Sequence, residues 1–325
     1  MIKYLQVHKT DCVNPYENLA VEKCLLDSVD DETVILYLWQ NEKTVVIGRN
    51  QNSFLECRCR ELEKDGGFLA RRLSGGGAVF HDTGNLNFTF LCKTENYDLE
   101  KQLNVIKTAC AIAGINTEFS GRNDILADGR KFSGNAFYNS KGRSYHHGTI
   151  LINADMTAMQ KYLSPPEAKL ESKGVKSVRS RVVNLSELSE GLSCKLMADY
   201  MLKAFEKVYN LTLAPAPIPD AEKVAALKEE YGSYDYLYKM PIPFSTNLKN
   251  RFSWGTIDLS FEVSNGVIND IIVFSDSMDW SIRDKIEKAL LKCPFKEDKI
   301  YSSLTKVFEK DVADDIFSLI KTKLL

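Results

Sequence analysis

Residues 71–87 read RRLSGGGAVFHDTGNLN and place three consecutive glycines between two arginines and a His-Asp pair. Glycine lacks a Cβ and reaches positive φ cheaply, so a run of glycines lets backbone N–H groups turn inward toward an anion. Arg71 and Arg72 also favour an anionic ligand. The stretch matches neither common phosphate-binding signature, because no Lys-Ser or Lys-Thr pair follows and the spacing is not GxGxxG. This glycine loop therefore predicts an anion site without identifying the anion.

The composition is that of an ordinary globular protein. The chain has 325 residues, of which 44% are hydrophobic and 26% charged, and its formal net charge is -2. This length accommodates one large and one smaller domain. The near-neutral charge disfavours a general nucleic-acid binder, so we expect no nucleic-acid partner. The amino-terminal stretch does not resemble a signal peptide and no window reaches the apolar length of a membrane span, so we expect a cytoplasmic protein with no membrane partner.

The eight cysteines are scattered and contain no C-x-x-C pair, which favours free, structural thiols over a zinc site or disulfides. Capping and turn signals then outline the secondary structure. Asn14, Pro15 and Glu17 form a helix-start signal, and Ser193 caps another helix. The predicted helices cover residues 17–28, 99–113, 194–209 and 221–232, and the predicted strands cover residues 33–40 and 44–50.

A proline-rich stretch near residues 213–245 marks a change of composition along the chain. Beyond it, a Ser-Asn-Gly turn joins two strand-like runs, and two amphipathic helical stretches follow at residues 281–293 and 312–325. We therefore predict a large domain over residues 1–245 and a small α+β domain over residues 246–325.

Residues 121–153 hold a second cluster of polar and small residues, built around an Asp-Gly hairpin turn. Counting back from the turn pairs Ala127 with Arg130, Leu126 with Lys131, Ile125 with Phe132 and Asp124 with Ser133. Asp124 and Lys131 then share one face as diagonal neighbours, which places a cation and a carboxylate on one surface without forcing a closed salt bridge. A one-residue bulge would move Lys131 to the opposite face. The alternative is an exposed hairpin whose charges are only solvated.

Together these clusters resemble the lipoate-protein ligase family of the single-chain type. The matching strings occur in the family order over nearly the whole chain: NLAVE, LYLWxNExTVVIGRNQN, RRLSGGGAVFHDTGNLN, GRNDI, RKFSGNA, HHGTILIN, KLESKGVKSVRSRVVNL and FSWGTIDLSFEV. Each string alone is weak evidence for the family, but the ordered set is specific to it. The resemblance implies an α+β fold of the biotin and lipoate ligase class, in which helices flank a mixed β-sheet and a small α+β C-terminal domain follows.

The resemblance also implies a two-step reaction that uses ATP and magnesium. Lipoate and Mg-ATP would give lipoyl-AMP and pyrophosphate, and the lipoyl group would then pass to the ε-amine of a lysine on an acceptor protein. The implied acceptors are lipoyl domains of the E2 subunits of 2-oxoacid dehydrogenase complexes and the glycine cleavage H protein. The choice between lipoate and octanoate stays open.

Individual residues receive roles from the same resemblance. Lys131 matches the catalytic lysine that touches both the nucleotide and the lipoyl carbonyl, and Asp124 is the implied magnesium contact. The implied ATP-binding positions are Arg72, Gly77, Ala78, Val79, Phe80 and Lys131. The implied lipoate-binding positions are Arg72, Gly76, His81, Lys131, His147 and Gly148.

Four alternatives compete with this interpretation. An octanoyl or lipoyl transferase of the same superfamily needs a reactive cysteine beside the acyl pocket, and no cysteine lies between Lys131 and Cys194. A biotin ligase would carry a GRGRxGR-like string where this chain reads RRLSGGG. A non-catalytic lipoyl-domain-binding protein is disfavoured because the lysine and the glycine loop are both intact. A basic nucleic-acid patch could use Lys173, Lys176, Arg179 and Arg181, but we expect that segment to close over the active site instead.

Overall fold

The computed structural model describes residues 2–51, 53–120, 124–163, 182–238, 246–264 and 266–321. The chain divides into two compact units, which we call unit 1 and unit 2. Unit 1 comprises Met1–Ile47, Ser53–Arg72 and Ala78–Leu237, and unit 2 comprises Gly48–Asn52, Leu73–Gly77 and Tyr238–Leu325. Two short segments from the amino-terminal part of the chain therefore belong to unit 2, and one of them contains the glycines of the glycine loop.

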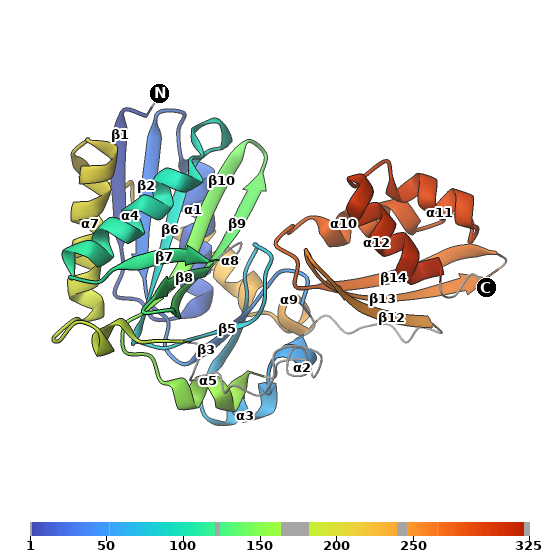
Figure 1. Cartoon of the computed structure of the whole chain (residues 1–325), viewed down its shortest axis with the longest axis horizontal. Coiled ribbons are helices and arrows are strands. Elements are labelled where there is room, and N and C mark those ends of the chain that lie inside the picture. Colours follow the sequence, from blue (N-terminus) through green and yellow to red (C-terminus); the bar gives the residue numbers. More distant parts are fainter. Residues whose placement is uncertain are drawn as a thin grey trace. The chain divides into compact units, whose positions relative to one another are not determined.

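A mixed eight-stranded sheet forms the centre of unit 1 (Figure 1). In spatial order its strands are β11 (Leu213–Pro215), β1 (Tyr4–Lys9), β2 (Thr33–Trp39), β6 (Asn85–Lys93), β10 (Arg143–Leu151), β9 (Arg130–Ser140), β8 (Asp124–Ala127) and β7 (Thr117–Ser120). Strand β1 runs parallel to β2 and β11, whereas the other neighbours are antiparallel. Every residue of β2 is buried, as expected for a central strand covered on both faces.

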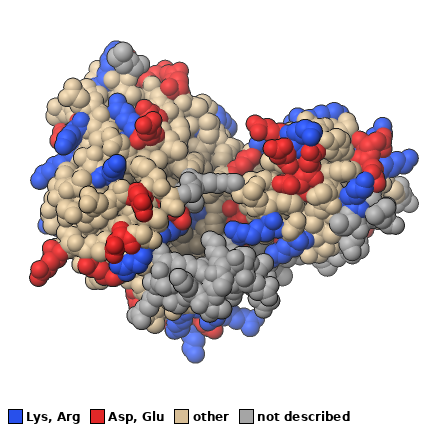
Figure 2. Space-filling view, viewed as in Figure 1, with Lys and Arg blue, Asp and Glu red and all other residues tan. Residues whose placement is uncertain are grey.

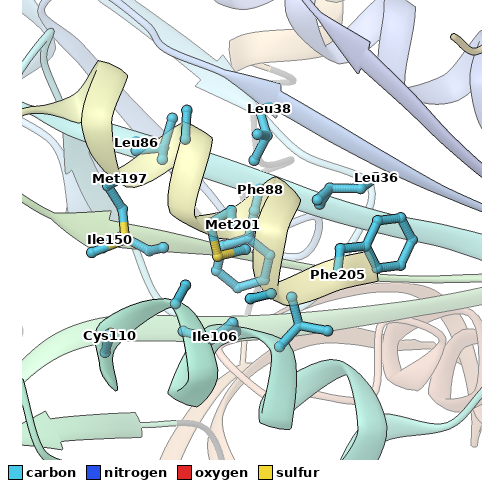
Figure 3. Close-up of a cluster of buried hydrophobic side chains, with 14 of the residues drawn as sticks. Leu36, Leu38, Leu86, Phe88, Ile106, Cys110, Ile150, Met197, Met201 and Phe205 are labelled. Atoms are coloured by element: carbon cyan, nitrogen blue, oxygen red, sulfur yellow. The ribbon is translucent and has the colours of Figure 1, made fainter. Parts of the chain in front are cut away.

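Helices cover both faces of this sheet because its strands alternate two sets of apolar side chains. Leu36 and Leu38 of β2 belong to the main hydrophobic core with α4 and α7 (Figure 3), whereas the hydroxyl group of Tyr37 faces α1. Figure 3 shows side chains from both helices meeting strand side chains in this core. The helices concerned are α1 (Pro15–Ser28), α4 (Leu99–Ile112) and α7 (Cys194–Tyr209), and α8 (Ala221–Gly232) packs against α1.

A second, three-stranded sheet in unit 1 contains the strands that precede and follow the glycine loop in the chain. Its strands are β3 (Thr44–Ile47), β4 (Phe68–Arg71) and β5 (Val79–His81), and β3 lies in the middle. Because β4 and β5 both pair with β3, the loop between them starts and ends beside the same strand. The remaining elements of unit 1 are α2 (Ser53–Glu56), α3 (Cys59–Lys64), η1 (Thr94–Asn96), α5 (Met156–Tyr162), η3 (Leu185–Glu187) and α9 (Tyr234–Tyr238).

Unit 2 contains an antiparallel three-stranded sheet and three helices with a hydrophobic core of their own. The strands are β12 (Thr246–Phe252), β13 (Gly255–Ser264) and β14 (Val267–Ser275), and the helices are α10 (Ile282–Leu290), α11 (Glu297–Leu304) and α12 (Lys310–Lys321). Because this core excludes unit 1 residues, unit 2 is an α+β module in its own right.

The α+β class and most of the predicted elements are confirmed. Asn14 and Ser193 cap α1 and α7 as expected, and the turn before Val267 joins β13 to β14. Helix α11 was not predicted. The predicted strands over residues 33–40 and 44–50 both exist, but they belong to different sheets of unit 1. The predicted domain boundary borders residues 239–245, which lie outside the described residues.

Candidate active site

The glycine loop makes close backbone contacts inside unit 2. Gly76 has a φ of 90°, a left-handed conformation that other residues adopt only at a cost. Gly75 is needed for a different reason, since a Cβ at this position would clash with the carbonyl oxygen of Ser277. The Gly76 N–H donates to that same oxygen over 2.9 Å. One N–H group of the predicted anion-binding loop therefore has a protein partner in this structure.

Arg72 follows β4 directly and is only 6% exposed. Its backbone N–H donates to the Ile47 oxygen over 3.0 Å, and its Nη1 donates to the Val46 oxygen over 3.1 Å. Burial lowers the pKa of the guanidinium group to about 10, and the nearby Tyr145 and Glu22 oppose this shift. Arg72 is therefore cationic at neutral pH, and a buried cation of this kind favours an anionic ligand.

Arg71, by contrast, has a structural role. Its Nε donates to the Tyr236 oxygen over 3.0 Å, and its Nη2 donates to Ser53 Oγ and to the Leu237 oxygen, each over 2.9 Å. These bonds tie β4 to α2 and α9. Of the two arginines that made an anion plausible from the sequence, Arg72 is the one whose burial points to a ligand.

A buried glutamate on α1 contacts a buried histidine on β10. His147 Nδ1 on β10 lies 2.9 Å from Glu22 Oε1 on α1, and the same oxygen accepts from Thr89 Oγ1 over 2.7 Å. Glu22 is 1% exposed, and Trp39 Nε1 donates to Thr89 Oγ1 over 3.2 Å. Because Glu22 accepts from Nδ1, the proton of a neutral His147 ring sits on Nδ1. Glu22 was not among the predicted site residues, because 125 positions of the chain separate it from His147.

His81 ends β5 and belongs to the same electrostatic neighbourhood. Burial, helped by the nearby Arg72 and His147, lowers the pKa of His81 to about 3. His81 is therefore neutral over the physiological pH range. Three of the predicted lipoate-binding residues, Arg72, His81 and His147, thus come together inside unit 1 although they lie on different strands or loops.

Lys131 on β9 forms an ion pair with Asp124 on β8. The Lys131 Nζ lies 2.7 Å from Asp124 Oδ1, and the two side chains are 34% and 36% exposed. Gly134 leaves room for the lysine, because a Cβ at Gly134 would lie 3.1 Å from Nζ. The prediction that the two charges share a surface is confirmed. The predicted placement did not require a closed salt bridge, and the structure forms one.

The predicted hairpin register holds only next to the turn. Asp128 and Gly129 have φ values of 52° and 67°, as a primed turn requires. A β-bulge follows, and the observed pairs are Ala127 with Arg130, Leu126 with Lys131, Ile125 with Ser133, and Asp124 with Gly134. The predicted pairs of Ile125 with Phe132 and of Asp124 with Ser133 are therefore wrong. Phe132 is fully buried, and the bulge lets it enter the core while Lys131 keeps its contact with Asp124.

The other predicted ligand contacts lie beside these residues in the chain. Ala78 precedes β5, Val79 and Phe80 lie on it, and the 2% exposed Phe80 packs against the ring of Tyr162. Gly148 lies on β10, where a Cβ would come within 2.7 Å of the Gly134 oxygen. The absence of a side chain at Gly148 therefore has a structural reason that is independent of any ligand.

A polar cavity of about 450 Å³ opens near the main chain of Lys131. Its lining includes Arg130, Asp155, Asn184 and Glu187, none of which the sequence singled out. The cavity is close to the main chain of Lys131 because Val182, which also lines it, forms a β-bridge with Lys131.

A magnesium ion would have few protein ligands here. Within the described ranges, no group of three or more His, Cys, Asp or Glu side chains is arranged to hold a metal ion. Magnesium is commonly bound by one or two carboxylates together with substrate phosphates. Asp124 is a single, partly exposed carboxylate, so it fits that arrangement and not a cage built by the protein alone.

Comparison with known proteins places this site in a family. Residues 14–206 match the model of the lipoyl protein ligase A/B catalytic domain, and residues 242–320 match that of the bacterial lipoate protein ligase C-terminus. Two lipoate-protein ligases A, from Psychrobacter cryohalolentis and Bdellovibrio bacteriovorus, are each 38% identical to the chain. These matches cover 88% and 93% of this chain and 87% and 92% of the relatives. The chain belongs to the lipoate-protein ligase family.

Solved structures related to the lipoate-protein ligase family share the fold. LipL1 from P. falciparum, in complex with lipoate, matches with a TM-score of 0.83 at 29% identity over 98% of both chains. A lipoate-protein ligase A bound with ATP matches 73% of this chain with a TM-score of 0.61 at 24% identity. The bipartite ligase of Thermoplasma acidophilum matches 76% of this chain with a TM-score of 0.64 at 24% identity.

Charge and hydrophobicity of this lipoate-protein ligase family member can be compared with the expectations from the sequence. Figure 2 shows acidic and basic side chains interspersed over the visible face of each unit. Lys173, Lys176, Arg179 and Arg181, which were expected to close over the active site, lie outside the described residues. Across the described part of the chain, no helix has both the length and the apolar character needed to span a membrane.

Proposed function

We propose that this protein is an ATP-dependent lipoate-protein ligase. It would activate lipoate as lipoyl-AMP and then transfer the lipoyl group to a lysine of an acceptor protein. The observation that carries the proposal is the partly exposed Lys131 ammonium, paired with Asp124, in a chain that matches both family models over most of its length. LipL1, a structural relative at 29% identity, binds lipoate.

In the first step, a carboxylate oxygen of lipoate attacks the α-phosphorus of ATP. A bond forms between that oxygen and the phosphorus, the bond from the phosphorus to the bridging oxygen breaks, and pyrophosphate leaves with the electron pair. Both reactants are anionic, so cationic groups must screen their charges and align them. Lys131 and Arg72 would supply this positive charge, with Lys131 between the carboxylate and the α-phosphate.

Magnesium, when bound with ATP, would neutralise phosphate charge and orient the triphosphate. Asp124 is the proposed protein contact for the ion. The end of the glycine loop, with Gly77 followed by Ala78, Val79 and Phe80, would hold the phosphates through backbone N–H groups, while the bond from the Gly76 N–H to the Ser277 oxygen holds the loop in place. The cavity near the main chain of Lys131 is the proposed place for the remainder of the nucleotide.

In the second step, the neutral ε-amine of an acceptor lysine attacks the acyl carbon of lipoyl-AMP. An amide bond forms, the bond from the acyl carbon to the AMP oxygen breaks, AMP leaves with the electron pair, and water takes up the proton that the amine loses. Arg72, His81 and His147 would contact the acyl ligand, together with Gly76 and Gly148. We propose lipoyl domains of E2 subunits and the glycine cleavage H protein as acceptors.

The main alternative is an acyltransferase that carries the acyl group on a cysteine without ATP. Such an enzyme needs a thiol whose pKa is lowered toward neutrality. Here burial raises the pKa of Cys92 and of Cys110 to about 12 and that of Cys194 to about 11. These thiols are therefore poor nucleophiles at neutral pH. The match to a ligase C-terminus also favours the ligase.

The test is to incubate the purified protein with lipoate, a lipoyl-domain acceptor and either ATP or no nucleotide, and to weigh the acceptor by mass spectrometry. We expect the mass of one lipoyl group to be added only when ATP is present. Release of pyrophosphate before acceptor is added would identify the adenylate step. Transfer from an acylated carrier protein without ATP would instead support the acyltransferase, and binding without any transfer would support a non-catalytic protein.

A further inference from the structure

A chain of buried side-chain amides leads from α1 to His81. Asn18 on α1 and Asn41, in the turn after β2, are both fully buried. Asn18 Nδ2 lies 3.0 Å from Asn41 Oδ1, and Asn41 Nδ2 lies 3.2 Å from His81 Nδ1. All three residues belong to unit 1.

Main-chain carbonyl groups fix the orientation of the first amide. Asn18 Nδ2 lies 3.0 Å from the Cys12 oxygen and 2.8 Å from the Gln40 oxygen. A carbonyl oxygen can only accept, so the group of Asn18 that faces both oxygens is the NH₂ group. The hydroxyl group of Tyr37 donates to Asn18 Oδ1 over 3.1 Å, which satisfies the other end of the amide.

The orientation of Asn18 dictates that of Asn41. If the Asn41 amide were turned around, two NH₂ groups would face each other at 3.0 Å, and both can only donate. Asn41 therefore presents its oxygen to Asn18 and its NH₂ group to His81. The Nδ1 of His81 must then accept, so it carries no proton.

This arrangement determines the tautomer of His81. Burial lowers the pKa of His81 to about 3, so the ring is neutral and carries its single proton on Nε2. His81 is 4% exposed, and its Nε2 is buried with no hydrogen-bond partner among the described residues. A buried donor without an acceptor is costly, so its retention points to a ligand that accepts the bond.

We propose that Asn18 and Asn41 are positioning residues that hold His81 as the Nε2–H tautomer, so that His81 donates to an anionic oxygen of the substrate. This inference rests on the proposed ligase function. The cationic Arg72 in the same neighbourhood favours an anionic acceptor. Two sources of such an oxygen are the carboxylate of lipoate and a phosphate of the nucleotide, and separate KM values distinguish them.

Replacing Asn18 or Asn41 would lower activity even if these residues were only structural. The decisive measurement is therefore the tautomer of His81. In a ¹⁵N NMR spectrum of the ligand-free protein, the protonated and bare nitrogens of an imidazole ring resonate far apart. The signals of His81 are assigned by their absence in His81→Asn. We expect wild-type His81 to show a protonated Nε2 and a bare Nδ1. This measurement needs no activity and no folded Asn41 variant.

The variant that tests the chain is Asn41→Asp. An ionised carboxylate still accepts from Asn18 but cannot donate to His81, so the proton should move to Nδ1 and Nε2 should become an acceptor. The substrate contact is then lost, and we expect KM for its source to rise about tenfold, as for a hydrogen bond to a charged group. If lipoate is the source, KM for ATP stays within about twofold, and the reverse holds if a phosphate is the source.

Gln102→Glu provides the matched control. Gln102 is a fully buried amide whose Oε1 lies 3.2 Å from Nδ1 of the buried His146, so this variant also places a carboxylate beside a buried histidine. We expect it to leave the His81 tautomer and both KM values unchanged.

Three results would overturn the inference. The first is a wild-type His81 protonated on Nδ1. The second is a tautomer switch in Asn41→Asp that changes neither KM. The third is a rise of both KM values that Gln102→Glu reproduces. A wild-type protein that does not lipoylate an acceptor would refute the proposed function instead, while its NMR spectrum would still decide whether the two amides set the tautomer.

Discussion

Lys131 is the residue whose charge the proposed first step needs most directly. Its ammonium would stabilise negative charge that grows between the lipoate carboxylate and the α-phosphate. Removing one preorganised donor of this kind costs about 10² to 10³ in rate. We therefore expect Lys131→Ala to remain folded, since the side chain is 34% exposed, and to lose about that factor in pyrophosphate release. Lys131→Arg should also lose pyrophosphate release, because the planar guanidinium group cannot replace a compact ammonium group in a confined gap.

The controls for Lys131 lie on the next turn of the same sheet. Lys141 and Arg143 flank the turn between β9 and β10, and replacing either with alanine should leave pyrophosphate release close to normal. A Lys131→Ala protein that forms lipoyl-AMP at nearly the wild-type rate would refute the role assigned to this lysine.

Two buried histidines make stability depend on pH. Burial lowers the pKa of both His81 and His146 to about 3, whereas an unfolded histidine titrates near 6.5. Below about pH 6.5 the unfolded chain therefore binds up to two more protons, so the free energy of unfolding falls as the pH is lowered and levels off below about pH 3. The expected slope from these groups approaches about 2.7 kcal/mol per pH unit between pH 6 and 4.

Urea unfolding at several pH values measures this slope. Carboxylates add their own pH dependence at the acid end, so the comparison is with His146→Asn, which should lose about half of the histidine contribution. An unchanged slope in that variant would mean that His146 is already protonated in the folded protein, contrary to its burial.

At the scale of elements, the glycine loop offers a test that separates backbone strain from ligand binding. Gly76→Val should weaken nucleotide binding, because a β-branched side chain opposes the φ of 90° and blocks close approach of a phosphate to the backbone. Gly66→Val is the matched control, since Gly66 has a similar φ of 72° but lies in open space. Calorimetric ATP affinity and the melting temperature are measured for both variants.

We expect both variants to lose comparable stability, and only Gly76→Val to lose ATP affinity. Equal loss of affinity in the two proteins would indicate general destabilisation, and normal affinity in Gly76→Val would make the loop a mere spacer. Gly75→Val is less informative, because its side chain would also collide with the main chain at Ser277.

The elements that could be predicted from the sequence are those decided by neighbours in the chain. The Asp128-Gly129 turn and the cap at Asn14 depend on a few consecutive residues, and both formed as predicted. The bulge after Lys131 could not be predicted in this way, because it follows from the burial of Phe132 in a core built by distant segments. The contact between Asn41 and His81 likewise depends on how the strands are arranged.

At the scale of the whole molecule, the least predictable feature is that unit 2 includes the glycine loop. The sequence places the loop in the middle of the large domain, but its glycines group with residues about two hundred positions later in the chain. The physical reason is the hydrogen bond from the Gly76 N–H to the Ser277 oxygen, together with the close approach of Gly75 to the main chain there, which only a residue without a Cβ permits.

This grouping gives a reason to expect unequal effects when the C-terminal segment of unit 2 is removed. A chain ending at Phe244 would lack Ser277, the partner of the Gly76 N–H, so the loop would lose the contact that holds it in place. Adenylate formation requires the loop to hold a triphosphate, whereas transfer from pre-made lipoyl-AMP involves a single phosphate. An ordered loop also contributes more when two anionic reactants must be aligned. We therefore expect truncation to slow adenylate formation more than transfer.

The two half-reactions can be measured separately, as pyrophosphate release from ATP and lipoate, and as acceptor mass gained from pre-made lipoyl-AMP. Circular dichroism must first establish that the truncated chain is folded. We expect the first rate to fall at least tenfold more than the second, which corresponds to about 1.4 kcal/mol of difference between the two barriers. Equal losses in a folded truncated chain would show that the C-terminal segment of unit 2 does not act through the glycine loop. In that case the bond between Gly76 and Ser277 would be a packing contact whose removal the proposed chemistry tolerates.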